Sequence, residues 1–217
     1  VEVRGEGRPV LMIPGLNSAA ETWSDTCDAL QADGIQCHLV QLPGFAGLPA
    51  RPQATGDDAE PFLPTMRDLL LDYIETAGLE RPAVVGHSLG GMMALMLASE
   101  QPDAIGSLVI VDSLPFFPAA MNPQASVETS RPMADSMREG MRAQDDETYA
   151  RNARAQAAMG MSRDAGRTEQ IRDWTAASDR AVTTQAMYEL FTTDLRPQLG
   201  SIDNPTMVLG AWAAYQP

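Results

Sequence analysis

Apolar runs alternate with amphipathic stretches over the first half of the chain. Residues 10–13, 83–85 and 108–111 are apolar at every position, which indicates strands buried on both faces. Residues 19–30 and 62–77 instead carry apolar side chains at helical spacing. Weaker strand patterns occupy three further segments: 1–3, 35–42 and 206–209. Strands that alternate with helices predict an α/β fold with a mostly parallel sheet flanked by helices.

The pattern changes after Asp112. Residues 114–200 contain no convincing buried strand. Methionine recurs there at every fourth position, which makes a one-sided helical stripe: Met133, Met137 and Met141. We therefore expect two units, a core formed by residues 1–113 and 201–217, and a helical insertion formed by residues 114–200.

The turn after the second apolar run carries the clearest chemistry. Its sequence is Gly86-His87-Ser88-Leu89-Gly90, a G-x-S-x-G pattern between an apolar strand and an apolar helix. Such a turn is so sharp that glycine is needed where the chain packs closely, and it lifts a strained serine above the sheet edge. The N–H of Leu89, at the start of the helix, is then placed to stabilise an oxyanion. The alternative is an ordinary strand-to-helix loop in which Ser88 caps the helix.

Composition and charge exclude several partners. Fifteen basic residues, all of them arginine, stand against 29 acidic residues, which gives a net charge of −14 at pH 7. Such a chain would be repelled by nucleic acid and by anionic membranes. No run of about 18 apolar residues is present, so no membrane insertion is expected. Neither a phosphate-binding loop nor a metal-ligand spacing occurs, so no metal and no cofactor is predicted.

The two cysteines, Cys27 and Cys37, lie ten residues apart in the sequence. We favour two buried thiols, with a disulfide as the alternative, because a helix and the following strand can approach closely. The chain begins with Val1 rather than methionine, so the sequence leaves the compartment open. A soluble protein that is cytoplasmic, or exported after loss of an N-terminal signal, is consistent with it.

Four features together make the sequence resemble the α/β-hydrolase superfamily along its whole length. They are the serine turn at 86–91, the oxyanion-type segment 11–16, the glycine turn 42–47 and the helical stretch between residues 112 and 206. The family more often has His-Gly where this chain has Pro14-Gly15, and an acid where it has Gln41. The resemblance implies an α/β-hydrolase fold in which the insertion is a helical cap. It also implies that Ser88 is the nucleophile and that the N–H groups of Leu16 and Leu89 form the oxyanion hole.

The chain departs from that family in its histidines. The family's order is serine, then an acid, then histidine. Here His38 and His87 both precede Ser88. We interpret His38 as a buried strand residue, and His87 as directed sideways from the turn. The catalytic histidine, with a further strand and helices, is therefore expected beyond Pro217, in a C-terminal part that is missing from this chain.

Asp112 is the predicted acid of the site. It follows a buried strand at the carboxyl end, where the chemistry of parallel sheets is usually found. Residues 210–217 contain neither aspartate nor glutamate, so they offer no competing acid. The alternative role for Asp112 is to cap the turn that follows the strand.

The resemblance implies a serine hydrolase that cleaves small-molecule carboxylic esters of small to medium acids through an acyl-enzyme on Ser88. Two other hypotheses for the function stay open. The same fold supports perhydrolysis, acyl transfer or C–C bond hydrolysis, and a chain without its base would be a non-catalytic binding module. The sequence leaves the oligomeric state open as well.

Overall fold

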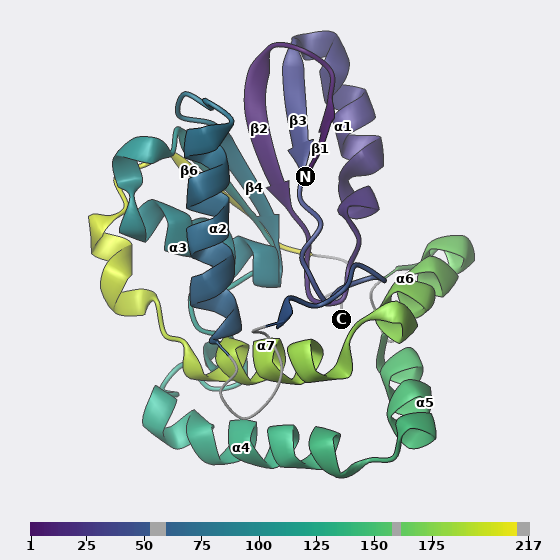
Figure 1. Cartoon of the computed structure of the whole chain (residues 1–217). Coiled ribbons are helices and arrows are strands. Elements are labelled where there is room, and N and C mark those ends of the chain that lie inside the picture. Colours follow the sequence, from purple (N-terminus) through teal and green to yellow (C-terminus); the bar gives the residue numbers. More distant parts are fainter. Residues whose placement is uncertain (53–59, 158–161, 212–217) are drawn as a thin grey trace.

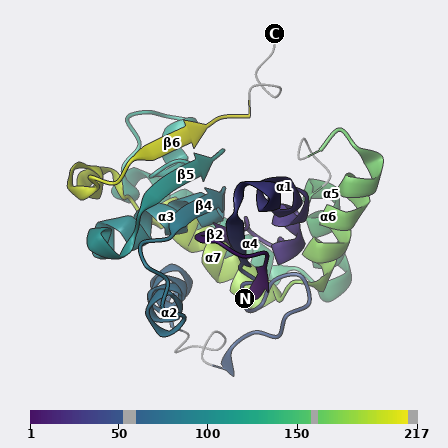
Figure 2. The ribbon, with the colours of Figure 1, turned by 90° about the horizontal axis from the view of Figure 1, so that it is seen from above.

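A single sheet organises the computed structural model, which describes residues 1–52, 60–157 and 162–211. Its strands follow the order β1-β3-β2-β4-β5-β6 (Figures 1 and 2). Their bounds are Glu2–Arg4 (β1), Arg8–Ile13 (β2), Ile35–Leu39 (β3), Ala83–His87 (β4), Ser107–Val111 (β5) and Thr206–Leu209 (β6). Strand β1 is antiparallel to β3, and every other pair is parallel. The predicted mostly parallel sheet is confirmed.

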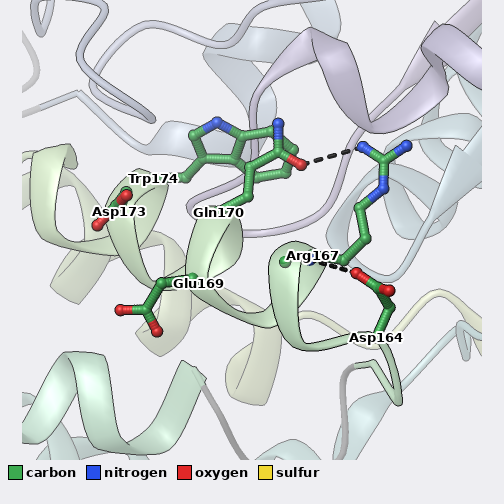
Figure 3. A pocket seen from close by; sticks show the side chains of 7 residues that line it. Asp164, Arg167, Glu169, Gln170, Asp173 and Trp174 are labelled. Carbon is green, nitrogen blue, oxygen red and sulfur yellow. Dashed lines mark hydrogen bonds between the residues drawn. The ribbon is translucent and has the colours of Figure 1, made fainter.

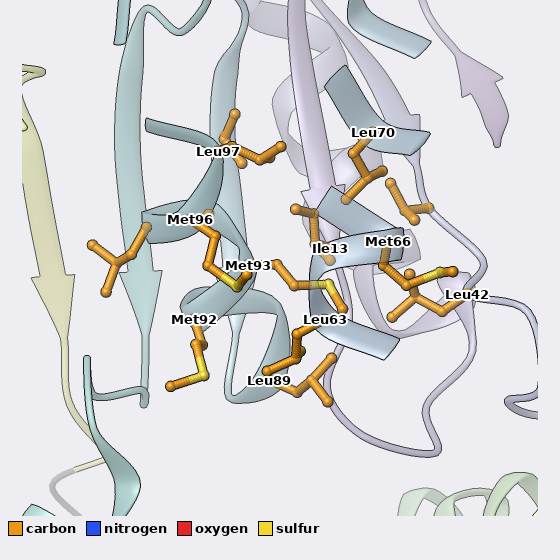
Figure 4. Packing of buried hydrophobic residues seen from close by; sticks show 14 of the residues in the cluster. Ile13, Leu42, Leu63, Met66, Leu70, Leu89, Met92, Met93, Met96 and Leu97 are labelled. Carbon is orange, nitrogen blue, oxygen red and sulfur yellow. The ribbon is translucent and has the colours of Figure 1, made fainter. Parts of the chain in front are cut away.

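Each face of the sheet carries its own apolar layer. Leu11 and Ile13 of β2 pack in one cluster with helices α2 (Phe62–Thr76) and α3 (Leu89–Glu100). Figure 4 shows Ile13 beside labelled residues of both helices. Val10 and Met12 of the same strand pack on the other face, against helix α1 (Ser24–Leu30). Neighbouring residues of a strand point to opposite faces, so a run that is apolar throughout requires cover on both.

The helix predicted over residues 19–30 forms in two pieces. A 3₁₀ turn, Ala20–Trp23, leads into α1, and a second 3₁₀ turn, Gln31–Asp33, follows it. Such tighter turns are common at helix ends. Gly34 closes the segment in a left-handed conformation with φ 67°, which glycine adopts without steric cost. The chain then enters β3.

Cys27 of α1 and Cys37 of β3 form a disulfide, so the favoured expectation of two thiols is wrong. Their Cα atoms lie 6.0 Å apart and both side chains are fully buried. Helix α1 packs directly on the face of the sheet to which Cys37 points. The spacing of ten residues allowed either outcome, because the direction of the two side chains follows from how the helix lies on the strand.

Four α-helices lie in the described residues between β5 and β6. They are α4 (Val127–Ala143), α5 (Asp146–Ala157), α6 (Ala165–Ala177) and α7 (Arg180–Thr192). Helix α4 packs against α7 and α5 against α6 (Figure 1), and the described part of this span contains no strand. No helix in the described residues is long and apolar enough to cross a membrane. That residues 114–200 form a separate unit stays a prediction.

The loop after β3 fastens these helices to the core. The backbone N–H of Asp179 donates to the carbonyl of Gly44 at 2.7 Å, and the N–H of Ala46 donates to the hydroxyl of Ser178 at 2.9 Å. Asp179 also begins α7, because its carboxylate accepts the N–H of Val182 at 3.0 Å. The start of α7 is thereby held next to the loop that leaves the sheet.

Candidate active site

Ser88 occupies the junction between β4 and α3 in a strained conformation, with φ 51° and ψ −118°. Its N–H donates to the carbonyl of Val111 at 3.0 Å. Its carbonyl accepts from the N–H of Gly91 at 2.9 Å, the N–H of Met92 at 3.2 Å and the hydroxyl of Ser113 at 2.6 Å. A strained residue persists only where its surroundings fix it, and these contacts supply that constraint.

Glycine is required on both sides of Ser88. A Cβ atom on Gly86 would lie 2.1 Å from the carbonyl oxygen of Gly90, and one on Gly90 would lie 2.3 Å from that of Ile13. Atoms at such distances overlap, so a larger residue at either position would push the turn away from the sheet. The glycines of the G-x-S-x-G pattern therefore permit close packing of helix, turn and strand.

The segment after β2 brings a second loop to Ser88. A Cβ atom on Gly15 would lie 3.4 Å from the Cβ of Ser88, so this loop passes directly beside the serine side chain. Leu16 follows Gly15 directly, and Leu89 is the first residue of α3, where a backbone N–H has no acceptor within the helix. The two amides predicted to form an oxyanion hole thus belong to the segments that meet at Ser88.

Gln41 stands where the resembling family has an acid, and it joins two loops. Its side-chain oxygen accepts the N–H of Ala20 at 2.8 Å, while its side-chain nitrogen donates to the carbonyl of Phe45 at 2.9 Å. A carboxylate accepts hydrogen bonds only, whereas a carboxamide both accepts and donates. Gln41 can therefore fix the loop after β2 and the loop after β3 with one side chain.

Asp112 follows the last residue of β5 and has a left-handed backbone with φ 45°. Its N–H donates to the carbonyl of Leu209 at 2.7 Å, and its carboxylate accepts the N–H of Ala211 at 3.3 Å. The side chain is exposed. Asp112 comes one residue after Val111, whose carbonyl holds Ser88, so the predicted acid and nucleophile stand on neighbouring strand ends.

His38 is engaged on both ring nitrogens. Nδ1 lies 2.7 Å from the hydroxyl of Tyr73 on α2, and Nε2 lies 3.0 Å from the side-chain oxygen of Gln36. The residue is 3 % exposed, and burial lowers the pKa of its imidazole. This geometry agrees with its interpretation as a buried strand residue that is satisfied within the core.

His87 lies at the end of β4, directly before Ser88. Its Nδ1 is buried without a hydrogen-bond partner among the described residues, and it lies 3.0 Å from where a Cβ of Gly15 would be. Burial lowers the pKa of this imidazole, and the charge of Asp112 acts in the opposite direction.

A cavity of about 380 Å³ opens between the helical insertion and the loop that follows Gly15. Its lining combines residues of that loop with residues of α4, α5, α6 and α7. The lining residues are Leu16, Asn17, Met137, Gly140, Met141, Gln144, Tyr149, Asn152, Ala153, Gln156, Ala157, Ile171, Thr175, Thr183 and Met187. Leu16 lines this cavity and is also one of the two residues predicted to form the oxyanion hole.

The sequence pointed to Met137 and Met141 of this lining through the methionine stripe. Both are half-buried at the cavity, whereas Met133 of the same stripe is 38 % exposed. Asn17, Tyr149 and the other polar residues of the lining carried no signal, because they come from separate segments that meet only in the folded chain.

A second, broader hollow of about 590 Å³ lies on α6 and the residues that lead into it (Figure 3). It shares no residue with the cavity or with the serine turn. Its charged side chains pair with other residues: Arg167 with Asp25, and both Glu169 and Asp173 with Arg154. Across the described chain, no group of three or more His, Cys, Asp or Glu residues is arranged to hold a metal ion.

The arrangement of strands, serine turn and inserted helices matches a known family. The sequence model of the alpha/beta hydrolase family matches residues 10–216. The chain belongs to this family. The resemblance on which the fold was predicted is therefore confirmed.

Proteins similar in sequence to this alpha/beta hydrolase include a methyl ester esterase and a putative carbamate hydrolase. It is 31 % identical over 121 residues to a pimeloyl-[acyl-carrier protein] methyl ester esterase of Vibrio atlanticus, which covers 56 % of this chain and 42 % of that protein. It is 33 % identical over 112 residues to a putative carbamate hydrolase RutD of Klebsiella pneumoniae, covering 49 % and 38 %. The chain thus aligns with less than half the length of these relatives.

Solved structures of the same fold cover nearly all of this alpha/beta hydrolase. A hydrolase from Pseudomonas aeruginosa superposes with a TM-score of 0.79 at 18 % identity, covering 97 % of this chain and 75 % of that one. The esterase EaEST from Exiguobacterium antarcticum gives a TM-score of 0.76 at 20 % identity, with 95 % and 74 % covered. At such identities the likeness concerns the fold.

Proposed function

We propose that this alpha/beta hydrolase is a serine esterase that cleaves small-molecule carboxylic esters of small to medium acids. The strained, firmly held backbone of Ser88 is the observation that carries the proposal. A serine in such a turn presents its hydroxyl above the sheet edge to an incoming carbonyl. A Vibrio relative is a methyl ester esterase and a structural neighbour is an esterase, which supports this class of substrate.

In the proposed reaction the catalytic base takes the proton of the Ser88 hydroxyl, and the serine oxygen attacks the ester carbonyl to form a tetrahedral oxyanion. The N–H groups of Leu16 and Leu89 donate to that oxyanion, because both belong to segments that converge on Ser88. The base gives the proton to the departing alcohol, which leaves an acyl-enzyme on Ser88, and a water deprotonated by the same base then releases the acid. The cavity beside Leu16 holds the acyl group, and the inserted helices, residues 114–200, act as a cap over the core formed by 1–113 and 201–217.

Asp112 is proposed as the acid that orients the base. Its position one residue beyond the carbonyl that holds Ser88 supports this role. His38 is a poor candidate for the base because both of its nitrogens are engaged. A histidine that follows Ser88 in the protein stays a prediction.

A fluorophosphonate probe tests the nucleophile directly. Such a probe is expected to label the protein once, and Ser88→Ala should abolish labelling. Ser99→Ala is the matched control, because Ser99 on α3 only donates to the carbonyl of Met96 and should leave labelling unchanged. Asp112→Asn should slow labelling about tenfold or more while the fold is kept, as loss of an orienting acid does in serine hydrolases.

Two outcomes would contradict the proposal. Labelling that survives Ser88→Ala would place the reactive group elsewhere. A folded protein that binds esters but never reacts with the probe would favour the binding-module alternative.

A further inference from the structure

The cavity beside Leu16 is lined without charge. None of its described lining residues is Asp, Glu, Arg, Lys or His, in a chain whose net charge is −14. A charged ligand placed there would lose its hydration without gaining a counter-ion, and that loss is costly. The lining nevertheless offers hydroxyl and carboxamide groups beside its methionines. It therefore suits an uncharged ligand that carries hydrogen-bonding groups.

Asn17 is the lining residue next to the proposed oxyanion donor Leu16. It is 9 % exposed and has a left-handed backbone with φ 56°. Its side-chain oxygen accepts from the hydroxyl of Thr183 on α7 at 2.7 Å, and this contact is buried.

The hydrogen bond from Thr183 engages the side-chain oxygen of Asn17 and leaves its carboxamide nitrogen free. With the oxygen fixed by Thr183, the two N–H groups have no partner among the described residues. The other amides of the lining differ. Asn152 donates to the side chain of Gln144 at 3.1 Å, Gln144 donates to the carbonyl of Gly140 at 3.2 Å, and Gln156 is exposed to solvent.

We propose that Asn17 determines specificity by donating a hydrogen bond to an uncharged acyl group that carries a second acceptor, such as a ketone, close to the ester. The description of the ligand as an acyl group rests on the proposed function. The acceptor lies within a few bonds of the ester carbonyl, because consecutive Cα atoms are about 3.8 Å apart and Leu16 binds the oxyanion. A nearly buried donor without a partner penalises any ligand that leaves it unpaired.

Three p-nitrophenyl esters test the proposal: the levulinate, which has a ketone, the valerate, which lacks it, and the glutarate monoester, which is anionic. Each kcat/KM is divided by the rate constant for hydrolysis of the same ester by hydroxide without protein, which corrects for its intrinsic reactivity. The protein should prefer levulinate to valerate about tenfold, the effect of one neutral hydrogen bond, and should disfavour the anionic ester more strongly.

Asn17→Ala should remove the preference for levulinate. Asn17→Gly should do the same while allowing the left-handed backbone, so it guards against an alanine variant that folds poorly. Asn122→Ala is the matched control, because Asn122 lies in an exposed loop outside the cavity and should keep the preference. A levulinate preference that persists in both folded Asn17 variants would overturn the proposal.

A binding measurement separates this inference from the proposed function. Levulinamide should shift the side-chain amide resonances of Asn17 in nitrogen-labelled protein, and valeramide should not. If Ser88-dependent hydrolysis is absent but this difference is seen, the esterase proposal fails and the role of Asn17 stands. If hydrolysis depends on Ser88 but both amides shift the resonance equally, the role of Asn17 fails alone.

Discussion

At the scale of single residues, backbone contact decides what the site tolerates. Ser88 keeps its strained backbone because strand β5 and the first turn of α3 bond both of its peptide groups. Gly86 and Gly90 let those elements approach each other. Neither position has room for a Cβ atom, so replacing either glycine even by alanine should lower the free energy of unfolding.

Gly90→Ala is expected to destabilise the protein by about 1–3 kcal/mol, because its Cβ would meet the backbone oxygen of Ile13 at 2.3 Å, and a backbone atom cannot move aside cheaply. Gly140→Ala is the matched control. Its Cβ would meet nothing within 4 Å on α4, and alanine should stabilise that helix by about 1 kcal/mol. Urea unfolding of both variants measures whether each substitution lowers or raises the free energy of unfolding. Equal effects would show that the contact at Gly90 is relieved by a small shift.

At the scale of elements, a side chain of α7 caps the N-terminus of α2. The carboxylate of Glu189, which is 7 % exposed, accepts the N–H of Phe62 at 2.7 Å and that of Leu63 at 2.6 Å. Gln185 donates to the same carboxylate at 2.6 Å. Helix α2 has no side-chain cap of its own at Pro61. The cap on a core helix is thus supplied by the inserted segment.

Glu189→Gln should destabilise the protein by about 1–3 kcal/mol, because a carboxamide oxygen replaces two carboxylate oxygens and leaves a buried N–H unpaired. Burial raises the pKa of Glu189, while hydrogen bonds from Leu63, Gln185 and Phe62 act against that rise. The folded state then holds the proton more tightly than the unfolded state does. The contribution of Glu189 to stability is therefore highest below its ordinary pKa and falls as pH rises through the folded pKa.

Urea unfolding from pH 4.5 to pH 8 measures this dependence. The free-energy difference between the protein and Glu189→Gln should shrink as pH rises, by about 1.4 kcal/mol for each unit of pKa difference. Glu139→Gln changes an exposed position of α4, so this variant should have the same free energy of unfolding as the unchanged protein at every pH. A constant difference for Glu189→Gln would mean that its pKa is the same in both states.

At the scale of the whole described chain, the two outer strands of the sheet differ. Strand β1 is short, and its Glu2 and Arg4 form an ion pair. Strand β6 instead exposes three apolar side chains, with exposed fractions of 58 % for Met207, 67 % for Val208 and 47 % for Leu209. Unprotected apolar edges invite pairing with other chains, whereas charged edges resist it.

Val208→Lys should therefore reduce self-association of the 217-residue chain without lowering its thermal stability. Sedimentation velocity over a range of concentrations measures the effect. Met121→Lys is the control, because Met121 is 68 % exposed but follows a 3₁₀ turn instead of forming a sheet edge. An equal reduction in both variants would attribute the effect to added charge.

The local pattern of the sequence determined most of the fold. Runs that are apolar at every position specified strands buried on both faces, and helical spacing over 62–77 specified α2 nearly to its ends. The turn around Ser88 could be predicted because its glycines, its strand and its helix are neighbours in the chain. Information of this kind lies within a few residues of where it acts, so the sequence displays it directly.

The tertiary structure alone decided what depends on contacts between distant segments. The disulfide between Cys27 and Cys37 depends on how α1 lies against β3. The cap of α2 by Glu189 joins residues more than 120 positions apart. The hydrogen bond between Asn17 and Thr183 exists only because the loop after β2 and helix α7 meet at one cavity. No spacing along the chain encodes such a meeting, because it is set by how the helices pack on the sheet.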